Sequence, residues 1–156
     1  MYFININKLK QDIIEDRFSQ RDRFLYLFAC VILTEIFLIM PDFFPELYRD
    51  ITWGDKVVDI FYIIIVAIGT FVMYKFNGGE KGKDFTDRYL AIIWVVGIRA
   101  ILWFILIGVV LEIIALSLNW SDELVDYGFL FLEIGMEVYI YYRSSKVIKE
   151  IALATR

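Results

Sequence analysis

Four apolar segments place the strongest constraint on what this chain can fold into. They cover residues 24–40, 57–76, 89–118 and 125–142. A helix needs about 20 apolar residues to cross the roughly 30 Å hydrocarbon core of a bilayer, and each segment approaches or exceeds that length. The chain has 156 residues, 60% of them hydrophobic, which leaves room for a single membrane domain. We therefore predict an all-α polytopic membrane protein that folds as a four-transmembrane-helix bundle.

The first 23 residues differ from these segments because charged and apolar side chains alternate through them. Leu9, Ile13 and Phe18 recur at helical spacing, and Asn7 is a suitable N-cap. The charged part is too long for a signal peptide. The pattern predicts a cytoplasmic amphipathic helix over 1–23, which either lies on the inner membrane surface or packs on a partner or a neighbouring subunit.

The basic residues predict the orientation of the spans. Segments 1–23, 75–88 and 143–156 carry 5, 4 and 4 of the 16 Lys and Arg residues, whereas the other two connections carry only Arg49 and Lys56. Cytoplasmic segments of membrane proteins are enriched in Lys and Arg. Both termini and the connection between the second and third spans are therefore expected in the cytoplasm, with 143–156 as a basic helical tail.

Acidic residues form a stripe along the fourth apolar segment. At about 100° per residue, Glu133 and Glu137 lie roughly 20° to either side of Asp126 around a helix axis, and Ser144 falls at about 0°. A carboxylate that faces lipid costs at least a few kcal/mol. The stripe must therefore face protein, a counter-charge or water.

Further charged residues lie inside the other apolar segments. A rise of about 1.5 Å per residue places Glu35 about 16 Å and Arg99 about 15 Å from the cytoplasmic side, and Glu137 about 18 Å from the outer side. These three share one level near the midplane, so we expect Arg99 to form an ion pair with Glu35 or Glu137. Asp59 and Asp126 are expected nearer the outer end.

The excess of acid over base at this level points to an ion pathway. A single arginine cannot neutralise these acids, so the remainder must be protonated or face water. Rings of carboxylates select cations in pores, and four spans enclose too little space for a water path, so we expect a homo-oligomer. The alternatives are a cation-coupled transporter, a membrane immunity protein that blocks a toxin, and an intramembrane enzyme. The predicted pathway residues are Glu133, Glu137, Asp126, Glu35 and Asp59.

The residue types argue against catalysis and metal binding. The sequence has no His and a single Cys, Cys30, which lies inside an apolar segment. This excludes a His-ligated metal, a His base and an intramolecular disulfide. Two acids at positions i and i+4 without a second catalytic element are weak support for chemistry. We therefore predict no enzyme activity, no metal and no cofactor.

The layout of four spans, with acids at Glu35, Glu133 and Glu137 and basic cytoplasmic segments, resembles the small membrane effectors of bacterial anti-phage systems, in particular the Hailong type. The resemblance covers the whole layout and rests on no sharp motif. It implies a tetrameric channel in the bacterial inner membrane, held shut by a single-stranded DNA oligomer that a partner nucleotidyltransferase makes. Basic residues would then contact the DNA phosphates, or alternatively only anionic lipid. They are Lys8, Lys10, Arg17, Lys81, Lys83, Arg143, Lys146 and Lys149.

Overall fold

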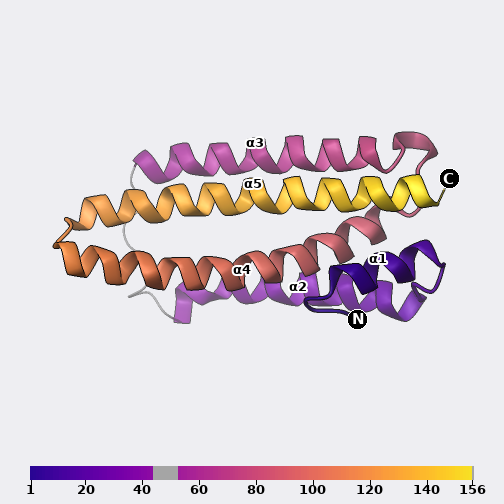
Figure 1. Cartoon of the computed structure of the whole chain (residues 1–156), viewed down its shortest axis with the longest axis horizontal. Helices are drawn as coiled ribbons and strands as arrows, with labels where there is room; N and C mark the ends of the chain where they lie inside the picture. Colours follow the sequence, from indigo (N-terminus) through magenta and orange to yellow (C-terminus); the bar gives the residue numbers. More distant parts are fainter. Residues whose placement is uncertain (44–52, 156) are drawn as a thin grey trace.

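The computed structural model describes residues 1–43 and 53–155 (Figure 1). This part of the chain is helical and contains no strand, which confirms the predicted all-α class. Its elements are α1 (Ile6–Ile14), α2 (Gln20–Phe43), α3 (Trp53–Phe76), the 3-10 turn η2 (Gly79–Lys81), α4 (Phe85–Leu118) and α5 (Asp122–Ala154).

Three of these helices are long and apolar enough to cross a membrane. The spans are Gln20–Pro41 in α2, Val58–Phe76 in α3 and Phe85–Leu118 in α4, and they match the first three predicted segments to within a few residues. The largest differences are at the starts of the first and third spans, which begin four residues earlier than predicted. Pro41 lies inside the last turn of α2. A proline removes only its own backbone donor there, so the turn survives.

The fourth predicted segment lies in α5, a continuous helix of 33 residues. Asp126, Glu133 and Glu137 make this stretch less apolar than the other three. The predicted basic tail is not a separate element, because α5 continues through it to Ala154.

The four long helices form a row in the order α3, α5, α4, α2 (Figure 1). α4 and α5 make the most extensive contact, α3 packs on α5, and α2 packs on α4. α2 and α3 are consecutive in the sequence, yet they form the opposite edges of the row. The arrangement is therefore more open than the predicted four-helix bundle, in which every helix has two long neighbours.

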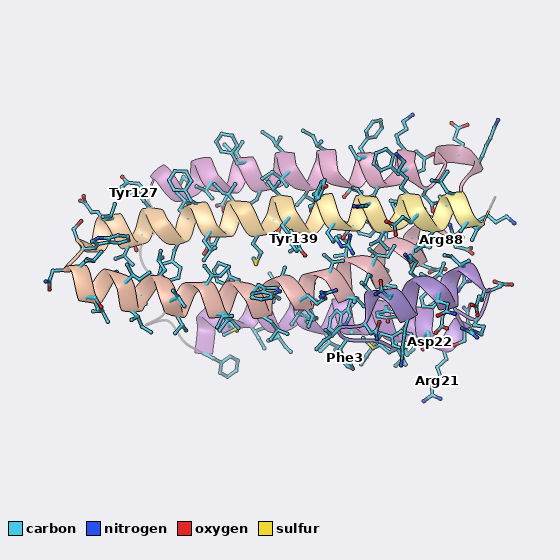
Figure 2. All side chains as sticks on the ribbon, viewed as in Figure 1. Phe3, Arg21, Asp22, Arg88, Tyr127 and Tyr139 are labelled. Atoms are coloured by element: carbon cyan, nitrogen blue, oxygen red, sulfur yellow. The ribbon has the colours of Figure 1, made fainter. Side chains whose placement is uncertain are left out.

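The buried core lies at one end of this row, which we call the closed end. There α1 and the start of α2 meet the end of α3, the start of α4 and the end of α5 (Figure 1). In Figure 2, Asp22 and Arg88 lie toward the closed end and Tyr127 lies at the opposite, open end. The fully buried large side chains belong to the closed end; they include Leu9, Tyr26, Met73, Ile92, Ile148 and Ile151.

α1 is shorter than the predicted helix over 1–23. It has nine residues, and its N-cap is Asn5 instead of Asn7. The chain leaves this helix through Asp16, which has a left-handed φ of 56°. α2 then begins directly after Ser19. The sequence pattern predicted one continuous helix because Phe18 keeps the helical spacing. In the structure Phe18 lies between α1 and α2 and packs on the core from there.

The apolar face of α1 packs within its own chain. Ile6, Leu9 and Ile13 are buried, and α1 contacts α4 and α5. The Nζ atom of Lys10 donates to Glu150 on α5 over 2.9 Å. This hydrogen bond holds the pKa of Glu150 below its usual range. The sequence predicted that this helix packs on the membrane surface or on another molecule. In the structure α1 packs on α4 and α5 of its own chain.

Candidate functional site

Three of the predicted pathway acids line one cavity at the open end, which we call the acidic cavity. It has a volume of about 280 Å³ and lies between α3 and α5. Asp59 comes from α3, and Asp126 and Glu133 come from α5. The Asp59 and Asp126 side chains are exposed, and Glu133 is half-buried.

The helix geometry explains why these acids meet. Asp126 and Glu133 are seven residues apart, which is about two helical turns and puts both on one face of α5. α3 and α5 run in the same direction from the open end (Figure 1). Asp59 and Asp126 each lie within the first two turns of their helix, so they reach the same level of the row.

Tyr62 is a functional candidate that the sequence analysis missed. Its hydroxyl donates a hydrogen bond of 3.0 Å to Oε2 of Glu133, and its ring lines the acidic cavity. It follows Asp59 by three residues, so both lie on the same face of α3. The three-residue spacing from Asp59 was the sequence signal that could have identified Tyr62. The hydrogen bond holds the Glu133 carboxylate at the cavity wall.

A second cavity of about 510 Å³ lies where α4 ends and α5 begins. Glu112 and Asp126 both line it, so Asp126 borders both open-end cavities. In residues 1–43 and 53–155, no group of three or more His, Cys, Asp or Glu side chains could hold a metal ion. The open-end acids therefore line two cavities that share Asp126.

The three midplane charges are not brought together. Glu35 is exposed on α2 at the edge of the row, whereas Arg99 on α4 and Glu137 on α5 are half-buried. None of the three makes a hydrogen bond or an ion pair with another described residue. Glu137 also does not line the acidic cavity. The Arg99 ion pair stays a prediction, without support from contacts within one chain.

The candidate phosphate contacts at the closed end differ in how accessible their charges are. Lys10 is paired with Glu150, and Nη2 of Arg17 lies 2.6 Å from Oε2 of Glu15. These two cations are therefore already partly neutralised. Arg143 is half-buried, and the remaining five candidates are exposed: Lys8, Lys81, Lys83, Lys146 and Lys149.

Arg88 is a basic residue that the sequence analysis counted only as an orientation signal. In the structure it is 5% exposed and lines a cavity of about 510 Å³ with Lys81 and Lys83. Its Nη1 atom donates to Oδ1 of Asn77 over 3.1 Å. A cation at the edge of an apolar segment ordinarily reaches the membrane surface. Its burial depends on the fold of the connection after α3, which no local pattern shows.

Comparison with known proteins identified no relative of this chain. No family model matches the chain, and neither a curated protein nor a solved structure matches it.

Proposed function

We propose that this protein is a homo-oligomeric, cation-conducting pore of a bacterial inner membrane. The observation that carries the proposal is the acidic cavity, where Asp59, Asp126 and Glu133 converge from two helices. Carboxylates that line a narrow, poorly solvated passage attract cations and repel anions. The cavity would form part of the outer mouth of the pathway, and Glu137 would lie one helical turn deeper.

Crossing of the membrane by α5 is part of this proposal. α5 packs between α3 and α4, both of which are apolar enough to span. A Cβ atom at Gly108 of α4 would lie 3.1 Å from the Phe129 ring of α5, and Glu133 of α5 bonds to Tyr62 of α3. A helix held this closely between two spans shares their depth. Its acids are tolerable there because they face a cavity and a hydroxyl donor.

Assembly is supported by the open row and by two charges without partners. Glu35 lies mid-span on the exposed face of an edge helix, and Arg99 lies at a similar depth on α4. A carboxylate that faces lipid is costly, whereas an Arg–Glu contact across a subunit interface compensates both charges. We propose that the midplane pair forms between subunits, with a tetramer as the favoured assembly. This places Glu35 in an interface beside the ion pathway.

The biological role follows from the resemblance in layout. The protein would be a defence effector whose opening depolarises the inner membrane, with both termini in the cytoplasm. Its inhibitor would be a nucleic-acid oligomer made by a partner nucleotidyltransferase and bound by the exposed lysines of the closed end. Overproduction without the inhibitor should then stop growth and dissipate the membrane potential.

Ion flux from liposomes that contain the purified protein tests the pore. Wild type should release K⁺ faster than Cl⁻. The triple variant Asp59→Asn, Asp126→Asn, Glu133→Gln keeps side-chain size and hydrogen bonding but removes the cavity charge. Its K⁺ flux should fall about tenfold or more, and its preference for cations should shrink.

Glu123→Gln provides the matched control, because Glu123 is exposed on the same helix but lines neither open-end cavity. It should conduct like wild type, and the detergent-solubilised mass should be the same oligomer for all variants. Absence of flux from an oligomeric wild type would refute the pore. A monomeric mass without flux would instead favour a membrane immunity protein or a small transporter.

A further inference from the structure

The cavity around Arg88 at the closed end, which we call the Arg88 pocket, is built differently from the acidic cavity. It lies between the α3–α4 connection and the end of α5, and its volume is about 510 Å³. Three cations line it, Lys81, Lys83 and Arg88, together with Asn77 and Thr155. The two acids of the same connection, Glu80 and Asp84, do not line it.

Arg88 carries a buried positive charge that forms no ion pair with an acid among the described residues. Its guanidinium makes two neutral contacts: Nη1 donates to Asn77 Oδ1 over 3.1 Å, and Nη2 donates to Thr155 Oγ1 over 3.5 Å. The buried Nε atom has no hydrogen-bond partner. Asp84 attracts Arg88 only from beyond ion-pair distance, and its own ion pair is with Arg23, over 3.5 Å. Burial of a charge without a counter-charge is costly, so this arrangement is incomplete without an anion.

The free hydrogen-bonding capacity of Arg88 suits an oxyanion. Each terminal nitrogen of a guanidinium has two N–H groups, and here each has a single acceptor. One donor therefore remains on each of Nη1 and Nη2. Two neighbouring donors match the two oxygens of a phosphate group, and such charge-assisted contacts are among the strongest hydrogen bonds in proteins.

The wall of the pocket is preformed. Nδ2 of Asn77 donates to the Lys83 carbonyl over 3.1 Å, which holds the connection against the end of α3. A Cβ atom at Gly82 would come within 2.5 Å of the Asn77 carbonyl oxygen, and Gly78 has φ of 112°. Only glycine fits these two positions without strain. The connection is thus held in a shape that places Lys81 and Lys83 beside the buried Arg88.

We propose that the Arg88 pocket binds a phosphate group. The source is either a soluble phosphate compound or the headgroup of an anionic lipid, because Arg88 lies in the first turn of the third span, at the level of the membrane surface. The inference does not require the pore, since it rests on the closed end alone. Lys81 and Lys83 draw the anion to the pocket, and Arg88 binds it and gains the counter-charge that it lacks.

Thermal unfolding of the detergent-solubilised protein, freed of lipid and phosphate, tests the soluble source. Inorganic phosphate should raise the midpoint by about 5 °C at saturation relative to chloride of equal ionic strength. Native mass spectrometry tests the lipid source, where phosphatidylglycerol should remain bound and phosphatidylcholine should not. A response to phosphate identifies a soluble ligand, and retention of phosphatidylglycerol alone identifies a headgroup; either result supports the pocket.

The double variant Lys81→Gln, Lys83→Gln alters only exposed side chains and should weaken the binding about tenfold, and Arg88→Gln should abolish it. In the absence of phosphate, Arg88→Gln should be as stable as wild type, because the amide replaces an uncompensated charge. Arg21→Gln removes an exposed cation at the start of α2, outside the pocket, and should bind normally. The proposal fails if neither probe binds better than its control, or if the double lysine variant binds like wild type.

Discussion

Ile148 at the closed end has no exposed surface, whereas Ile60 in the open half of α3 exposes 58% of its own. The most apolar 18-residue stretch of each span is also mainly exposed, since only 6% of that of α2 and 11% of those of α3 and α4 is buried. The closed end also holds ion pairs, such as that between Lys10 and Glu150.

This difference has a physical reason if the open half lies in lipid. Lipid tails are about as apolar as leucine, so a span gains little by burying its side chains against other helices. A closed end in contact with water gains the full hydrophobic stabilisation and needs a core. The two ends should therefore respond differently to the same substitutions.

The largest contrast is expected for equal truncations at the two ends. Ile148→Ala leaves a cavity in the closed-end core and should lower the free energy of unfolding by about 2–5 kcal/mol. Ile60→Ala removes the same atoms from an exposed surface and should change it by less than about 0.5 kcal/mol. Denaturant titration of both variants in one detergent measures the difference. Equal losses would mean that the two ends do not differ in packing.

Glycine substitutions test where α3 and α5 are in closest contact. A Cβ atom at Gly69 would collide with the ring and Cβ of Tyr141, whereas one at Gly135 meets nothing within 4 Å. Gly69→Ala should therefore cost about 1–3 kcal/mol of unfolding free energy. Gly135→Ala should be neutral or slightly stabilising, because alanine favours the helix. A harmless Gly69→Ala would show that the two helices separate easily there.

The midplane charges test whether the open half is completed by neighbouring subunits. Under the proposed assembly, Glu35→Gln or Arg99→Gln should weaken oligomerisation about tenfold, and the double variant should weaken it by less than the sum of the two. Glu112→Gln serves as the control, because Glu112 is exposed on α4 near its open-end terminus. Concentration-dependent mass measurements report the effect. Additive losses would exclude a direct contact between Glu35 and Arg99.

The smallest effect is expected at the Lys10–Glu150 contact, which is partly exposed. Glu150→Gln should cost at most about 1 kcal/mol at pH 7. Because folding lowers the pKa of Glu150, this contribution is present at neutral pH and should disappear as the pH falls below 4.5, the usual value for the group. Glu80→Gln, a change of an exposed acid at the same end, serves as the control. Unfolding midpoints at several pH values measure both.

Local patterns were sufficient for part of the candidate site. The spacing of Asp126 and Glu133 placed them on one helix face, and both line the acidic cavity. Counting residues placed Asp59 at the same level as Asp126, and the two line the same cavity. The spacing of Tyr62 from Asp59 was also visible, but nothing local indicated that Glu133 would accept its hydrogen bond.

Sequence patterns alone predicted the helical class, the positions of the three most apolar helices and the acids that share a face of α5. These properties depend on the length and periodicity of single segments, so they can be predicted without knowing which helices touch. Tertiary structure alone decided the order of the row, the packing of α1 on α4 and α5, and the burial of Arg88. Each depends on contacts between residues far apart in the chain, because the partner of a helix face is chosen by packing among all the helices.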